Sequence, residues 1–298
     1  MKVKLFLLLL LPLLFIGCGK QPPINTGNTG KLNVLVSIAP YKKFVERISG
    51  DSLNVTTLLP KNANLHTFEP TPRLSQNWQN VDLWITVGAE FESQIKPALC
   101  EVNPNMVVLD LSKKITPMQM GKETHSLLPC KHTHTEDIHM WLGPKDVPAQ
   151  IRVITEALIQ LDSSMQTIFL EGMNALIADL ERLDRSISVR LLPFQGSALI
   201  VSHPSLGYFC KDYQLKQISI ECEGKSPAPQ DLQKILKSIE KETVLCVISQ
   251  EGFDSKGARL ISEKLSLPLI SFDPYAYDYF LNMETLSTQI ISNKSPKK

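Results

Sequence analysis

The sequence lacks a strong charge of either sign and lacks the common short metal motifs. Thirty-one basic and 30 acidic side chains leave a formal net charge of +1. This balance gives no electrostatic reason to expect a nucleic acid as partner. The six cysteines include no CxxC pair, and HExxH, the motif of many zinc peptidases, does not occur. The sequence therefore argues against a nucleic-acid-binding protein and gives no support to a zinc peptidase.

What is present indicates an exported globular protein. The chain has 298 residues, of which 43% are hydrophobic and 20% charged, enough for two domains of ordinary size. Lys2 and Lys4 precede a short apolar run that ends at Gly17-Cys18, the pattern of a secretory signal whose cysteine receives lipid. The alternative, a single membrane-spanning helix, would need about 20 apolar residues. We expect a signal peptide over 1–18 and a flexible tether, rich in Pro, Thr and Gly, over 19–31.

The cysteines other than Cys18 leave the disulfide pattern open. They are five in number, namely Cys100, Cys130, Cys210, Cys222 and Cys246. An exported chain can form one disulfide, but spacing alone does not give the pairing. Cys246 lies inside an apolar strand, which favours a buried thiol.

Strands and helices alternate on both sides of one long helix. In the first half we predict strands at 32–38, 54–59, 82–87 and 106–110, helices at 41–49, 91–99 and 147–161, and a long surface loop at 112–137. In the second half we predict strands at 198–202, 215–220, 244–249 and 269–272, and helices at 231–241, 256–265 and 283–292. Strands separated by helices favour parallel sheets. The fold class is therefore α/β, with two lobes that each hold a mostly parallel four-stranded sheet flanked by helices.

The helix between the lobes is predicted over 163–192, where apolar residues recur at helical spacing. Ser163 and Gln166 form a Ser-x-x-Gln start signal, and Pro193 stops the pattern. A helix of this length spans about 45 Å. An ordinary long core helix would show the same spacing, but the similar flanks favour a rigid connection. We expect an N-terminal lobe at 32–161, the linking helix at 162–193 and a C-terminal lobe at 194–298.

Four metal-capable side chains come after predicted strands, one of them beyond the long loop that follows the fourth strand. They are His66, His139, His203 and Asp273. Ligands of open α/β sheets bind beyond the carboxyl ends of strands, so these side chains can meet in one cleft if the lobes face each other. Three imidazoles and a carboxylate suit zinc at a closed tetrahedral site. A lone histidine after a strand is more often a cap or a loop donor.

Several sequence blocks, in order, strengthen the metal hypothesis. They are NANLHTFEPTP at 62–72, VGAEFE at 87–92, DIHMWLGP at 137–144, VSHPSLGYF at 201–209, the segment 221–232, and FDPYAYDYF at 272–280. Together they resemble the metal-binding receptors of zinc and manganese ABC importers over about residues 32–291. Arg73, Gly143 and Ser226 depart from the usual pattern of that family, but none is an expected ligand.

The resemblance implies two α/β lobes joined by a rigid helix, with the metal between them bound by His66, His139, His203 and Asp273. Asp137, two residues before His139, is a candidate to orient that ring. The expected function is a monomeric, lipid-anchored receptor, periplasmic or on the cell surface, that delivers a divalent metal to an ABC permease in the cytoplasmic membrane. Nitrogen ligands favour zinc, with manganese or iron as alternatives. His125, His132 and His134 in the long loop are either an auxiliary metal site or a solvated loop.

Three other functions were weighed against the receptor. A secreted zinc hydrolase would need an open coordination position and a general base, for which Glu69 is the candidate. A sugar or amino-acid receptor would want aromatic platforms and an arginine clamp where histidine and aspartate fall. An adhesin is not distinguished by the sequence. Full coordination by four protein ligands leaves no place for a reacting water, so we expect a carrier and not an enzyme.

Overall fold

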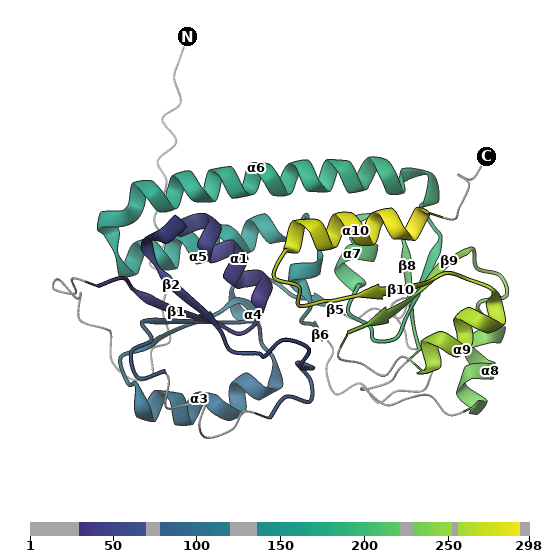
Figure 1. Cartoon of the computed structure of the whole chain (residues 1–298), viewed down its shortest axis with the longest axis horizontal. Helices are drawn as coiled ribbons and strands as arrows, with labels where there is room; N and C mark the ends of the chain where they lie inside the picture. The colour runs from purple at the N-terminus through teal and green to yellow at the C-terminus, as the bar shows by residue number, and fades with distance from the viewer. Residues whose placement is uncertain (1–29, 70–77, 120–135, 221–228, 252–255, 293–298) are drawn as a thin grey trace, which may run out of the picture.

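Two parallel sheets and one long helix organise the chain in the computed structural model, which describes residues 30–69, 78–119, 136–220, 229–251 and 256–292 (Figure 1). The first sheet has the order β2-β1-β3-β4 and the second the order β10-β9-β7-β8, and all neighbouring strands in both are parallel. The predicted fold class is therefore confirmed. Each sheet lies in its own half of the molecule, and the long helix α6 crosses both halves.

The first half is built from short buried strands and amphipathic helices. The strands are β1 (Asn33–Val36), β2 (Asn54–Thr57), β3 (Leu83–Thr86) and β4 (Val107–Asp110). The helices are α1 (Ala39–Ser49), α3 (Glu90–Val102), α4 (Leu111–Lys114) and α5 (Val147–Leu161). Every residue of β3 is buried, as expected of a central strand in a parallel sheet covered on both faces. The helices α1 and α5 cover one face and α3 lies on the other (Figure 1).

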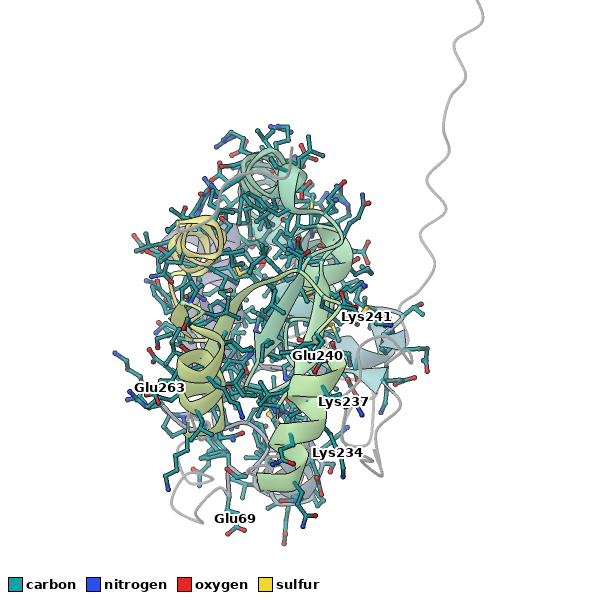
Figure 2. All side chains as sticks on the ribbon, turned by 90° about the vertical axis from the view of Figure 1, so that its right-hand side faces the viewer. Glu69, Lys234, Lys237, Glu240, Lys241 and Glu263 are labelled. Atoms are coloured by element: carbon teal, nitrogen blue, oxygen red, sulfur yellow. The ribbon has the colours of Figure 1, made fainter. Side chains whose placement is uncertain are left out.

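The second half repeats the arrangement. Its strands are β7 (Ala198–Val201), β8 (Lys216–Ser219), β9 (Val244–Gln250) and β10 (Leu269–Phe272). Its helices are α7 (Gly207–Asp212), α8 (Pro229–Ser238), α9 (Lys256–Leu265) and α10 (Tyr279–Ile291). The outer helices α8 and α9 pack on a small apolar cluster of their own, and they carry Lys234, Lys237 and Glu263 on the surface (Figure 2).

The helix α6 (Gln166–Leu191) is shorter than the predicted 163–192. Ser163–Met165 form a 3-10 turn before it, and Leu192–Phe194 form another after it. The side chain of Asp162 accepts the backbone N–H of Ser164, so Asp162, and not Ser163, supplies the cap at this end. The helix packs against α1, α5 and α10, and its buried side chains belong to one apolar core that both halves share.

Part of the predicted surface loop at 112–137 is ordered structure. It contains most of α4, and β5 (Met118–Gln119) pairs antiparallel with β6 (Glu136–Asp137). These strands are too short to show a period in the sequence. The helix α7 and the first turn of α10 were also missed; α10 begins at Tyr279, where the side chain of Asp278 accepts the backbone N–H of Leu281.

Of the cysteines that the structure describes, one is disulfide-bonded, and the two at 130 and 222 lie outside the described residues. Cys100 is disulfide-bonded, while Cys210 and Cys246 are buried thiols. Within the ranges that the structure describes, no helix is both long enough and apolar enough to cross a membrane. The predicted signal peptide, the lipidated Cys18, the tether up to residue 29, and the histidines at 125, 132 and 134 lie outside the described residues.

Candidate metal site

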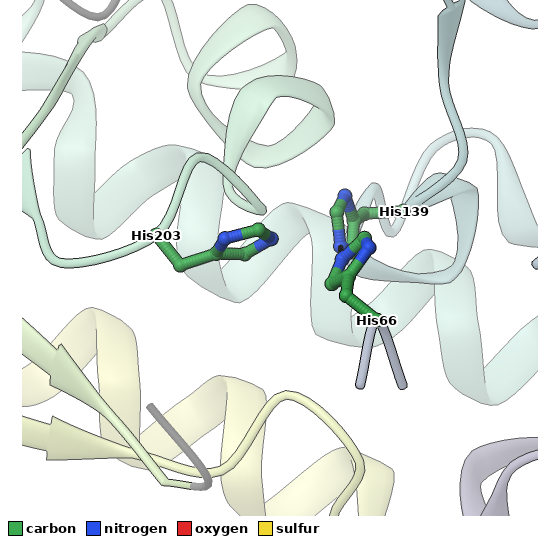
Figure 3. Close-up of side chains that lie close together, drawn as sticks. All are labelled: His66, His139 and His203. Carbon is green, nitrogen blue, oxygen red and sulfur yellow. Dashed lines mark hydrogen bonds between the residues drawn. The ribbon is translucent and has the colours of Figure 1, made fainter. Parts of the chain in front are cut away.

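Three of the four expected ligands converge between the two halves. One nitrogen from each ring of His66, His139 and His203 lies within 4.8 Å of the others. Figure 3 shows the ring of His203 pointing from its own half toward the other two rings. The Nε2 atoms of His66 and His139 are 3.4 Å apart. Two nitrogens bound tetrahedrally to one zinc at about 2.0–2.1 Å would lie about 3.3 Å apart, so the observed spacing fits a shared ion.

Each histidine is held by a turn that follows a strand. His66 lies in the loop after β2, where its backbone N–H donates to the side chain of Asn64 at 2.8 Å. His203 follows β7, and its carbonyl accepts the N–H of Ser205 at 2.9 Å. His139 begins the 3-10 turn Met140–Leu142. His139 and His203 are buried, while His66 is exposed, so one side of the cluster faces solvent.

Asp137 orients the ring of His139. Its Oδ1 lies 2.8 Å from His139 Nδ1 and 2.9 Å from the backbone nitrogen of His139, which donates to it. When Nδ1 carries the proton, Nε2 has a free lone pair that can bind a metal. Nε2 is also the atom that lies near His66. The sequence hypothesis that Asp137 is the partner of His139 agrees with this geometry.

Electrostatics keep His203 neutral. Burial lowers its pKa well below 6.5, and the nearby rings of His66 and His139 lower it further. A neutral imidazole is the form that binds a metal, so this ring is ready for a cation without first losing a proton.

Asp273 is not among the described side chains that meet within the 4.8 Å limit. Its Oδ1 accepts the backbone N–H of Tyr275 at 2.8 Å, and its carbonyl accepts the side-chain amide of Asn282 at 2.8 Å. Burial raises the pKa of Asp273, while the Tyr275 N–H and the charge of Lys61 lower it. Its role as fourth ligand therefore stays a prediction.

Glu69, the base that a hydrolase would use, is exposed. Figure 2 shows its side chain pointing outward from the edge of the molecule. It is not a member of the histidine group.

Comparison with known families places the chain in one of them. A family model described as the periplasmic component A of zinc-uptake complexes, ZnuA, matches residues 34–293. The chain belongs to the ZnuA family. Members of this family are periplasmic metal-binding receptors of ABC importers, so the receptor predicted from the sequence is confirmed at that level.

Individual relatives of the ZnuA family match over nearly the whole chain. A protein of Chlamydia trachomatis serovar D, described by its name as metal-binding, is 30% identical over 283 residues, or 95% of this chain and 97% of that protein. The high-affinity zinc uptake system protein ZnuA of Bacillus subtilis is 25% identical and covers 85% of this chain and 82% of its own. A crystal structure of ZnuA matches with a TM-score of 0.79 and 30% identity, over 87% of this chain and 98% of that chain.

The sequence did not indicate two other residues that touch the site. Gly207 and Tyr208, in the second half, contact Asp137 in the first. Both lie in the block 201–209 that carried the resemblance, but only the histidine of that block had an evident chemical role.

Proposed function

We propose that this chain captures zinc outside the cytoplasmic membrane and delivers it to an ABC permease, with His66, His139, His203 and Asp273 as the ligands. The observation that carries the proposal is the meeting of three ring nitrogens within 4.8 Å between two halves of the chain. Three nitrogen donors favour zinc over the harder manganese ion. The ZnuA-type relatives support the same choice of metal.

Asp273 completes the proposed site by offsetting part of the charge of the cation. It lies on the loop that follows β10, and the neighbouring carbonyl of Pro274 accepts the indole N–H of Trp141 at 2.7 Å. This contact ties the Asp273 loop to the block that contains His139. In the proposed complex, the carboxylate of Asp273 binds the ion that the three rings hold.

A carrier must also release its ion. Four protein ligands leave no open coordination position for a reacting water, which favours transport over hydrolysis. Because α6 packs against both halves, we expect a small tilt and local loop shifts on binding instead of a wide hinge motion. Because a metal binds the neutral form of imidazole, acid should weaken zinc binding.

Metal analysis of the tag-free mature protein, offered zinc, manganese and iron together, tests the proposal. We expect one zinc per chain in the wild type and loss of it in His139→Ala. Glu69→Gln is the control, because Glu69 is exposed and is not one of the four proposed ligands, and it should keep one zinc. Absence of stoichiometric metal in the wild type would reject the proposal, and stoichiometric manganese or iron would reassign the cargo. Hydrolytic turnover that depends on His203 would favour an enzyme.

We further propose that the receptor is a monomer anchored by lipid on Cys18. The basic start, the apolar run and the Gly17-Cys18 junction support this attachment. Labelling of cells with a radioactive fatty acid should mark the wild type and not Cys18→Ser. Equal labelling of both would disprove the anchor. Light scattering of the mature protein, with and without zinc, tests the monomer.

A further inference from the structure

The carboxylate that orients His139 is enclosed by the opposite half of the molecule. Asp137 is 3% exposed, and it lies on β6, next to the first-half ligand that it holds. The residues that close over it, Gly207 and Tyr208, begin α7 in the second half. Asp137, the hydrogen-bond partner of His139, is thus covered by the half of the chain that supplies His203.

Gly207 lies so close to Asp137 that any side chain at this position would have to displace its neighbours. A Cβ atom added at Gly207 would lie 2.5 Å from Asp137 Oδ2 and 2.8 Å from the Cε of Met118. Both distances are below ordinary van der Waals contact. Since a carboxylate at the end of its side chain moves more easily than backbone, a methyl group at position 207 would displace the carboxylate of Asp137.

Tyr208 holds the same segment by its hydroxyl group. This hydroxyl donates to the backbone carbonyl of Asp137 at 3.2 Å and accepts the backbone N–H of Met118 at 2.7 Å. Met118 and Asp137 are paired residues of β5 and β6. One buried side chain from the second half therefore joins both strands of the hairpin that ends at Asp137.

We propose that Gly207 and Tyr208 are positioning residues for the ligand His139, acting through Asp137 from the opposite half. This inference rests on the proposed metal function. In this arrangement the ring of His139 has its correct tautomer and direction only when the two halves are packed together. The orientation of His139 for metal binding therefore depends on the contact between the two halves, and not only on the loop that carries this ligand.

Zinc affinity, measured by competition with a chromophoric chelator, gives the first test. Loss of a partner that orients a metal ligand typically costs about 10–100-fold in affinity, so we expect a loss of this size in Asp137→Ala and in Gly207→Ala. Tyr208→Phe keeps the carboxylate and should lose less, about 3–10-fold. Tyr213→Phe is the matched control. Tyr213 lies at the other end of α7, directly after its last residue, and its ring faces Lys145 of the first half, but none of its described contacts is with Asp137.

A double-mutant cycle separates positioning from general damage. In the Asp137→Ala background there is no carboxylate for the new methyl group to displace, so Gly207→Ala should cause little further loss. If Gly207→Ala weakens zinc binding equally in both backgrounds, or if Tyr213→Phe weakens it as much as Tyr208→Phe, the proposal is wrong.

A measurement without metal makes the test independent of the proposed function. In 15N-histidine-labelled apo protein, the ring nitrogens of His139 should report a proton on Nδ1 in the wild type and in Tyr213→Phe. Gly207→Ala should shift the ring toward the other tautomer. An unchanged tautomer would refute the positioning role even if zinc binding falls. If the wild type binds no zinc, the carrier function fails, but the tautomer measurement still decides the positioning role. If Gly207→Ala does not fold, the same measurement on Tyr208→Phe decides the positioning role.

Discussion

The indole N–H of Trp141 donates to the backbone carbonyl of Pro274 at 2.7 Å, which connects the block after His139 to the loop of Asp273. The rings of Trp141 and Tyr275 also lie against each other, with centroids 6.0 Å apart. The loop belongs to the second half by sequence but is fixed to the first half by these contacts. This relationship gives the first prediction.

Trp141→Phe should weaken zinc binding by about fivefold. The variant keeps an aromatic ring but removes a hydrogen bond worth about 1 kcal/mol, and the Asp273 loop would spend less time in place. Trp84→Phe is the control. Trp84 is equally buried and its indole donates to the hydroxyl of Ser37 within the first half. Chelator competition on both variants checks this, and equal losses would contradict the prediction.

The contribution of His203 to the stability of the metal-free protein should fall as the pH drops below about 6.5. Burial lowers the pKa of His203 in the folded state below 6.5. Between the pKa of the folded state and 6.5, the unfolded chain binds a proton that the folded chain does not, so acid favours unfolding. Relative to His203→Gln, the wild type should lose up to about 1.4 kcal/mol per pH unit there. Urea unfolding with chelator present, from pH 7 to 5, measures both slopes; parallel slopes would show that His203 does not contribute.

Glu92 should change the pH dependence of stability in the direction opposite to His203. Burial raises its pKa from 4.5 to about 7, although Ser37 and the backbone N–H groups of Val87, Gly88 and Ala89 lower it. The folded state then holds a proton between pH 4.5 and 7 that the unfolded state releases, so this residue stabilises the fold at low pH and less as the pH rises. Replacement by glutamine should remove a pH-dependent contribution of about 3 kcal/mol between these limits. Glu90→Gln, at an exposed position of the same helix turn, should keep the wild-type slope. The same urea series at each pH compares the three proteins.

At Gly172, the helix α6 lies directly against the backbone of α1. A Cβ there would meet the backbone carbonyl of Ile48, with 2.7 Å to its carbon, and backbone cannot move aside as a side chain can. Gly172→Ala should therefore destabilise the protein by about 3 kcal/mol, despite the better helix propensity of alanine. Asn174→Ala, two residues along the same helix and exposed, should change stability by less than about 0.5 kcal/mol. Urea unfolding decides, and similar stability of the two variants would contradict the packing argument.

Sequence reasoning worked where the pattern repeats. The buried strands, α5 and the long helix were all found, because apolar periodicity records which face of an element is covered. Three of the four expected ligands also meet in space. His66 and His203 follow strands β2 and β7, which the sequence located, whereas His139 follows the short strand β6. The pattern could not locate β5, β6 or α7, which are too short to repeat. It also gave no reason to single out Gly207, whose importance lies in the space taken by Asp137, a residue 70 positions earlier.

The helix α6 has a consequence for how the molecule melts. Its buried side chains belong to the same apolar core as residues of β1 and of α10, so removing either half would strip the other of part of its interior. Heat or denaturant should consequently melt the whole chain in one transition, and neither fragment should be obtainable as a folded product by itself. For a receptor built this way, we expect release of the metal through small loop shifts and not through a wide hinge motion.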